Sequence, residues 1–272
     1  MRPATIVALA ILATVPAPAR AHLGVEELAD RLDAEIARHP EQADLHLQRA
    51  RVHLLAHRVQ ESLAELDVAA RHGADRDVVG TTRGEALLAA GDPRAARAEL
   101  DRVLRRRPDA YGTLFERGRV WLALGNAKHA ADDFGRAIAG LKTPRPEHVI
   151  ARRDALLSLG RRAAAVRALD EGMARIGHVA SLELAAIDLE VEMGRDAQAL
   201  RRLERLLAGT PANPVWVARR GDLLRRIGRT PEARAEYARA LDMVAGRRAP
   251  AFEHLRQHVE TALAESAREE KR

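Results

Sequence analysis

Five glycines recur along the chain at a nearly constant spacing. Gly91, Gly125, Gly160, Gly194 and Gly228 stand 34, 35, 34 and 34 residues apart. Each separates two stretches that carry a helical apolar pattern. Self-similarity at a period of this size is typical of a solenoid built from one repeated helical unit. The spacing therefore constrains the architecture before any single residue is interpreted.

The composition favours helices alone. Of the 272 residues, 47% are hydrophobic but only 3% are aromatic. Alanine and leucine supply most of the apolar set, and both form helices more readily than strands. We therefore expect an all-α fold. The formal net charge of +6 is too small for the basic surface of a nucleic-acid-binding protein, and no nucleic-acid-binding motif is present in the sequence.

The N-terminus resembles a secretory signal peptide. A basic start is followed by an apolar run from Ala4 to Val15 and by a small-residue cleavage site that ends at Ala21. The run is shorter than the roughly 20 residues that a membrane-spanning helix needs. We expect residues 1–21 to be removed, and the mature chain to begin at His22 and to be exported to the periplasm. The sequence contains no cysteine, which excludes disulfides and a lipid-modified cysteine anchor.

Aligning the chain on the glycine period gives six units. Their windows are 43–76, 77–110, 111–145, 146–179, 180–213 and 214–247. The eighth position is small and the twenty-fourth is bulky in four of them, as in Ala50 and Leu66, Gly84 and Leu100, Gly118 and Phe134, and Gly221 and Tyr237. A small residue facing a large one lets the two helices of a unit approach closely. The glycine at the fifteenth position is expected to end the first helix in a left-handed conformation.

These small, bulky and glycine positions resemble the tetratricopeptide repeat family over residues 43–247. The resemblance implies a right-handed α-solenoid of about six helix-turn-helix repeats. Residues 22–42 look like an N-terminal flanking helix, and residues 248–272 look like a C-terminal capping helix and tail. His57 stands where the first unit should have its glycine, so we expect that unit to turn differently. Arg153 and Ile187 replace small residues, which predicts altered packing in the fourth and fifth units.

Charge follows the same period. The seventh position is an arginine and the twenty-third an acid in four units, as in Arg49 and Glu65, Arg83 and Glu99, Arg117 and Asp133, and Arg220 and Glu236. In an antiparallel helix pair these two positions lie at about the same height. We therefore predict an ion pair within each of these units, worth about 0.2–1 kcal/mol if it is partly exposed.

The resemblance also implies where a partner binds. First helices line a concave face in this family, and their second, fifth, ninth, twelfth and thirteenth positions point into it. The predicted peptide-binding residues come from the fifth and ninth positions and are Arg51, Glu85, Phe115, Arg119, Ile150, Asp154, Leu184, Asp188 and Asp222. The charged row is mixed in its first half and acidic in its second, which favours a basic protein or peptide.

Two alternatives concern the same surface. The charged row can instead be a solvated ladder, in which Glu85 lies between Arg51 and Arg119 and the aspartates pair with second-helix arginines. Some family members bind a C-terminal carboxylate through asparagines and lysines in the groove. The corresponding positions here hold neither residue type, so the sequence gives no support for that mode.

Eleven histidines raise a second functional class, a metal-handling protein of the cell envelope. The pairs His53/His57 and His254/His258 are four residues apart, a spacing that places two rings on one helix face. Cleavage after Ala21 would also make His22 an N-terminal histidine, which can chelate copper through its amine and ring. No cysteine and no repeating carboxylate completes either pair, so we predict no metal site and no cofactor.

No catalytic motif supports an enzyme. The sequence contains no nucleophile elbow, no phosphate-binding loop and no HExxH. We therefore predict an exported, non-catalytic scaffold that binds a protein or peptide partner on its concave face. The alternatives are the metal-handling protein and a subunit that recruits substrates to a separate enzyme.

Overall fold

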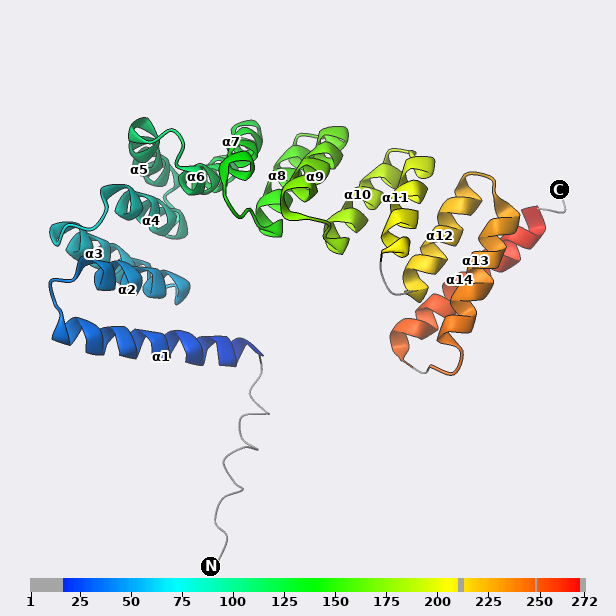
Figure 1. The fold of residues 1–272 in the computed structure, drawn as a ribbon, viewed down its shortest axis with the longest axis horizontal. Helices are drawn as coiled ribbons and strands as arrows, with labels where there is room; N and C mark the ends of the chain where they lie inside the picture. Colours follow the sequence, from blue (N-terminus) through cyan, green and yellow to red (C-terminus); the bar gives the residue numbers. More distant parts are fainter. Residues whose placement is uncertain (1–16, 210–212, 248, 270–272) are drawn as a thin grey trace, which may run out of the picture. The chain divides into compact units, whose positions relative to one another are not determined.

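The computed structural model describes residues 17–209, 213–247 and 249–269, and every regular element within them is a helix (Figure 1). The helices are α1 (Ala17–Arg38), α2 (Ala43–Leu55), α3 (Val59–Arg71), α4 (Arg76–Ala89), α5 (Pro93–Arg106), α6 (Tyr111–Ala123), α7 (Ala127–Gly140), α8 (Pro146–Ser158), α9 (Arg162–Ile176), α10 (Ala180–Glu192), α11 (Asp196–Ala208), α12 (Pro214–Arg226), α13 (Thr230–Val244) and α14 (Pro250–Glu269). The predicted all-α fold of helical repeats is confirmed.

The chain divides into two compact units between Leu141 and Lys142. The first unit contains α1 and the pairs α2/α3, α4/α5 and α6/α7. The second contains the pairs α8/α9, α10/α11 and α12/α13, followed by α14. The two helices of every pair contact each other, and each pair contacts the next pair of the same unit. In the described part of the chain, no helix is long and apolar enough to cross a membrane.

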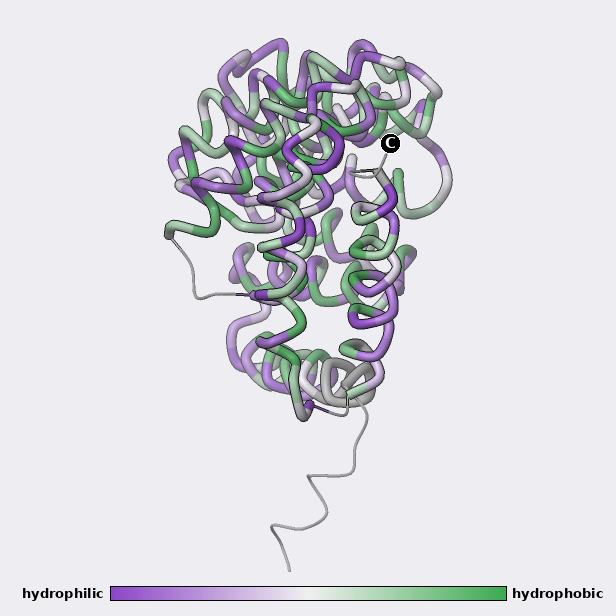
Figure 2. Tube along the Cα trace, turned by 90° about the vertical axis from the view of Figure 1, so that its right-hand side faces the viewer, coloured by the Kyte–Doolittle hydropathy of each residue, from purple (hydrophilic) through white to green (hydrophobic). Residues whose placement is uncertain are grey.

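Small residues face bulky ones within the pairs, as the repeat predicts. A Cβ atom built on Gly118 would lie 2.5 Å from the ring of Phe134, and one built on Gly221 would lie 2.6 Å from the ring of Tyr237. Both rings are fully buried. Figure 2 shows apolar residues, in green, recurring among polar ones along the helices. Neither helix of a pair can bury its apolar stripe alone, and neighbouring pairs must stack to bury a continuous core.

The fourth pair makes an equivalent close contact with small and large residues exchanged. In the second pair Gly80 of α4 meets Val103 of α5. At the same two repeat positions Val149 of α8 meets Gly172 of α9. In the fifth pair Ile187 is fully buried and forms part of the core of the second unit. The fourth pair therefore keeps one close contact between its helices, in which the second helix supplies the glycine.

The five periodic glycines all adopt the left-handed conformation, with φ from 68° to 81°. At each turn the glycine N–H donates to the carbonyl three residues earlier, and the N–H of the following residue donates to the carbonyl five residues before itself. These two hydrogen bonds satisfy carbonyls at the end of the first helix. The second helix can then begin at once.

His57 makes the same turn without being a glycine. Its φ is 59°, and its N–H donates to the carbonyl of Leu54 at 3.1 Å. The N–H of Arg58 donates to the carbonyl of His53 at 2.8 Å. The prediction that the first unit turns differently is therefore wrong. The hydrogen bonds and the packing of α2 on α3 impose the left-handed conformation on a residue that disfavours it.

The seventh-position arginine joins three helices, one more than predicted. Arg117 of α6 donates to Asp133 of α7 at 2.7 and 2.8 Å, and to Asp101 of α5 at 2.8 Å. We call such an arginine, with its carboxylates on both sides, a clasp. Two further clasps follow the same spacing, Arg49 with Asp33 and Glu65 and Arg220 with Glu204 and Glu236. Each clasp ties a helix pair to the helix before it.

The remaining predicted pair, Arg83 with Glu99, and the fifth helix pair, for which no ion pair was predicted, differ from this pattern. Arg83 bonds to Asp67 of the preceding helix at 2.8 Å, while its predicted partner Glu99 pairs with Arg102, so this intra-unit pair is not formed among the described residues. In the fifth pair the seventh position is Ala186, and the arginine comes from the second helix instead.

Arg202 of α11 occupies the twenty-third position, where the clasps have an acid. It is 7% exposed and bonds to Asp170 of α9 at 2.7 Å and to Glu183 and Glu190 of α10, each at 3.1 Å. The charges have exchanged helices, but the three-helix connection remains. A buried guanidinium needs such partners, because an unpaired buried charge is strongly unfavourable.

The strain at His57 gives a first prediction. His57→Gly should raise the free energy of unfolding by about 0.5–1 kcal/mol, because glycine has no Cβ clash at positive φ and the exposed imidazole makes no described contact that would be lost. Urea denaturation of the full chain measures the change. Gly125→Ala is the matched control and should be destabilising, although a Cβ there meets no atom within 4 Å. A His57→Gly variant of unchanged or lower stability would show that the turn is unstrained.

Candidate functional site

The surface predicted to bind a partner is formed by the first helix of each pair. In the first unit it lies on α2, α4 and α6, with Arg51, Glu85 and Arg119 at the ninth positions. In the second unit it lies on α8, α10 and α12, with Asp154, Asp188 and Asp222. We call it the first-helix face. The two units differ in how these charges are used.

In the second unit all three aspartates have partners. Asp154 accepts a hydrogen bond from Arg153 at 2.8 Å, and Asp188 pairs with Arg219 of α12. Asp222 accepts from the hydroxyl of Tyr237 at 2.8 Å and lies 3.1 Å from the ring of His258 on α14. This pairing agrees with the ladder alternative, except that the arginines come from first helices and not from second helices. The C-terminal helix covers part of this face at Asp222.

In the first unit the carboxylate of Glu85 has no such partner. It makes no hydrogen bond or ion pair with any described residue. Its neighbour Arg119 donates to Glu116 on the same helix at 2.7 Å, and the Glu116 side chain is only 15% exposed. Arg51 is exposed and forms no ion pair with Glu85. The ninth row of this unit thus contains one half-buried carboxylate whose cation neighbours do not contact it.

The electrostatics of Glu85 follow from this placement. Burial, and to a lesser extent the nearby Glu116, raises the pKa of Glu85 to about 7, against the opposing effect of Arg119 and Arg51. Burial also raises the pKa of Glu116, which the contact with Arg119 does not fully offset. Two carboxyl groups therefore share this part of the face with one bonded guanidinium. A further cation placed against Glu85 would favour its charged form.

The predicted apolar anchors are less accessible than expected. Phe115, Ile150 and Leu184 are all half-buried. The ring of Phe115 lies 5.1 Å from the ring of Phe134, and Leu184 packs on the core of the second unit. In the first unit the exposed apolar residues include Leu55 and Leu122, 68% and 38% exposed, at the ends of α2 and α6. They occupy the thirteenth and twelfth positions of the repeat, so the family pattern itself could have identified them.

A carboxyl group with a pKa near 7 is also suited to general acid–base catalysis. The charged groups that act on Glu85 are Glu116, Arg119 and Arg51.

The histidine pairs do not form a metal site in the described part of the chain. His53 lies in α2, but His57 lies in the turn after that helix, so the two do not share a helix face as predicted. His254 and His258 both lie in α14, where His258 contacts Asp222. No three histidine or carboxylate side chains are arranged to hold a metal ion within those residues. The side chain of His22 lies outside the described part.

Comparisons with known proteins identify the repeat. The tetratricopeptide repeat family model matches residues 81–146 and 184–250. No curated protein sequence matches the chain. Similar solved structures include a thermophilic TPR protein of Thermus thermophilus, with a TM-score of 0.52 and 19% identity over 62% of this chain and 93% of that one. Pseudomonas aeruginosa PilF has a TM-score of 0.52 and 14% identity over 76% and 94% of the two chains.

A third structure, YrrB, is described as a TPR protein with an unusual peptide-binding site. Its TM-score is 0.50, at 14% identity over 72% of this chain and 97% of that one. At these identities the likeness concerns the fold alone.

The raised pKa of Glu85 predicts a pH dependence of stability. Between about pH 4.5 and 7 the folded chain holds a proton on Glu85 that the unfolded chain has lost, so this group makes the free energy of unfolding fall as pH rises. Glu85→Gln removes that fall. The difference in free energy of unfolding between the variant and the wild type should therefore change by about 1–2 kcal/mol in favour of the variant from pH 4.5 to pH 8. Urea denaturation at each pH measures this difference.

Glu65→Gln is the control of opposite sign. Burial would raise the pKa of Glu65, but hydrogen bonds from Arg49 and His46 outweigh it and lower the pKa. Its charge therefore stabilises the fold above the unfolded pKa, and the benefit disappears as pH falls through the folded pKa. Glu65→Gln should be less stable than the wild type at pH 7, with a gap that closes in acid. If the free energy of unfolding changed with pH in the same way in both variants, the opposite pKa shifts of Glu85 and Glu65 would be contradicted.

Proposed function

Because the chain belongs to the tetratricopeptide repeat family, we propose that it is an exported, non-catalytic scaffold that binds a protein or peptide through the first-helix face of its first unit. Proteins built on this repeat bind protein or peptide partners. One structural relative, YrrB, is described as having a peptide-binding site. The proposal for this chain rests on its own residues, above all on Glu85.

The unpartnered carboxylate of Glu85 is the observation that carries the proposal. A lysine, an arginine or a free amino terminus of a partner would supply the cation that this part of the face lacks. The half-buried position strengthens such a contact, because water screens it less than it would on an open surface. Exposed Leu55 and Leu122, on α2 and α6, offer apolar contacts to the same partner. The partner is therefore a basic segment with apolar neighbours.

The second unit offers less to a basic ligand. Asp154, Asp188 and Asp222 are already bonded to Arg153, Arg219, Tyr237 and His258, so a cationic ligand would have to displace those groups. Displacing an existing ion pair removes most of the gain from forming a new one. We therefore assign the basic-partner site to the first unit.

Export is proposed from the sequence of the leader. Cleavage after Ala21 would shorten α1 at its N-terminal end. The buried residues of α1, Leu32 and Ile36, and its ion pair from Asp33 to Arg49 all follow that position. The shortened helix would keep these contacts with the first repeat.

A peptide selection tests the binding site. Immobilised full chain, offered a random peptide library, should enrich peptides that contain lysine or arginine, and Glu85→Gln/Glu116→Gln should weaken their binding by about tenfold, the cost of one charge-assisted contact. Asp154→Asn is the matched control and should bind as the wild type does. Below pH 7, binding should release a proton, because the bound cation lowers the pKa of Glu85. Calorimetry in two buffers of different ionisation enthalpy measures that release.

Two outcomes would contradict this site. One is an enriched set without basic residues, and the other is equal binding to the wild type and to Glu85→Gln/Glu116→Gln.

Export has its own test. The chain expressed with its leader in a bacterial host should appear in the periplasmic fraction, with His22 as the N-terminal residue found by sequencing. An Ala19→Asp/Ala21→Asp variant should remain unprocessed, because the cleavage site needs small residues. Retention of Met1 on the wild-type protein would contradict export.

A further inference from the structure

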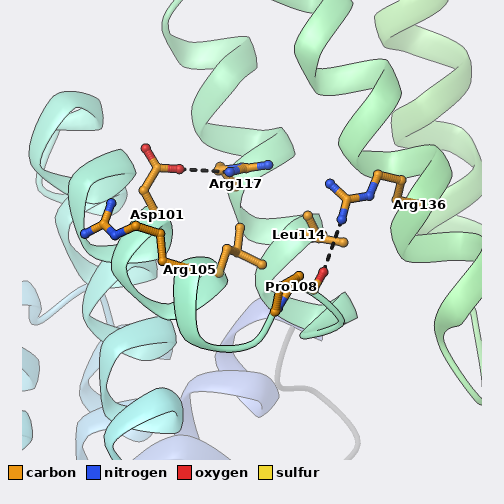
Figure 3. A pocket seen from close by; sticks show the side chains of 7 residues that line it. Asp101, Arg105, Pro108, Leu114, Arg117 and Arg136 are labelled. Atoms are coloured by element: carbon orange, nitrogen blue, oxygen red, sulfur yellow. Dashed lines mark hydrogen bonds and ion pairs between the residues drawn. The ribbon is translucent and has the colours of Figure 1, made fainter.

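A pocket of about 230 Å³ lies in the first unit where α5, α6 and α7 meet (Figure 3). Three of its seven lining residues are arginines, and only one is an acid. The lining consists of Asp101, Leu104, Arg105, Pro108, Leu114, Arg117 and Arg136. It is separate from the first-helix face. On α6, Arg117 is two residues before Arg119, so at 100° per residue their side chains point to opposite sides of the helix.

The three arginines are used unequally. Arg117 belongs to a clasp, and Asp101 and Asp133 together bond all three of its nitrogen atoms. Arg136 donates one hydrogen bond, at 3.1 Å, to the carbonyl of Pro108 and has no carboxylate partner among the described residues. Arg105 is exposed and makes no described polar contact. Two guanidinium groups at this pocket therefore keep donors that no acid of the described chain takes up.

The repeat provides an internal comparison. At the same repeat positions in the second unit, a pocket of about 250 Å³ is lined by Asp170, Met173, Ala174, His178, Glu183, Arg202 and Arg205. Arg205 corresponds to Arg136, but Ala174 replaces Arg105 and Glu183 replaces Leu114. Arg202 is bonded to Asp170, Glu183 and Glu190. The same cavity thus carries an excess of positive charge in the first unit, whereas arginines and acids are equal in number in its lining in the second unit.

We propose that the pocket bounded by Arg105 and Arg136 is a binding site for an oxyanion, a carboxylate or phosphoryl group. The planar guanidinium fork matches both groups, and a charge-assisted hydrogen bond from arginine to oxyanion is about twice as strong as a neutral one. Leu104, Pro108 and Leu114 provide apolar surface beside these groups. The site is independent of Glu85, and it has the opposite charge preference.

NMR of the arginine side chains tests the site directly. The Nε–H signals of Arg105 and Arg136, assigned by their loss in Arg105→Gln and Arg136→Gln, should shift and saturate when inorganic phosphate or acetate is added to the full chain at constant ionic strength. Each substitution should weaken binding about tenfold. Arg205→Gln, at the matching position of the second-unit pocket, should leave binding unchanged. Arg105 is exposed and makes no described polar contact, so Arg105→Gln also keeps the fold intact, which circular dichroism checks.

The two probes distinguish the sources of the anion. Tighter binding of phosphate indicates a phosphoryl group, and equal or tighter binding of acetate indicates a carboxylate. The proposal is overturned if the signals do not saturate, if sodium chloride alone produces the same shifts, or if Arg205→Gln weakens binding as much as Arg136→Gln does.

Discussion

Arginine–carboxylate clasps at Arg49, Arg117 and Arg220 each bridge three consecutive helices. Apolar packing holds the two helices of a pair together and also joins neighbouring pairs, as where Leu104 of α5 packs with Leu114 of α6. In the clasp of Arg117 one guanidinium bonds Asp101 on α5 and Asp133 on α7, so the register of all three helices is set at one point. Asp133 is only 4% exposed, and without Arg117 its charge would be buried and unpaired. At each helix pair that carries a clasp, the charged side chains that hold the helices together are therefore already bonded to one another.

This bonding explains where a ligand can be recognised. Charges that hold helices together are already bonded, and the aspartates of the first-helix face in the second unit are bonded as well. Charged groups without such a partner in the described chain include the carboxylate of Glu85 and the guanidinium groups of Arg105 and Arg136. The first suits a basic segment and the second an oxyanion. Both lie in the first unit, on opposite sides of its helices.

Much of the fold was predictable from the sequence, because each repeat places a small residue on one helix opposite a bulky residue on the other. The glycine period and the small-and-bulky pairs such as Gly118 and Phe134 identified the helix pairs correctly. The second arm of each clasp was missed, although acids such as Asp101, sixteen residues before the arginine, are visible in the sequence. His57 was misjudged because it was considered alone, and the role of Arg202 was not predicted. Packing imposes the turn on His57, and carboxylates on α9 and α10 compensate Arg202. The isolation of Glu85 depends on where Arg119 points, which spacing cannot determine.

The most direct test of this account is an NMR titration of the glutamate side-chain carboxyl carbons in the full chain, with signals assigned from Glu65→Gln and Glu85→Gln. Glu65 lies in a clasp, and its pKa is lowered because hydrogen bonds from Arg49 and His46 outweigh its burial. Glu85 has no such bond, and burial raises its pKa to about 7. The account predicts that Glu85 titrates near pH 7 and that Glu65 titrates below the ordinary glutamate range. If both titrate together near the ordinary value of about 4.3, Glu85 is not a buried carboxyl group without a cation partner, and the account is contradicted.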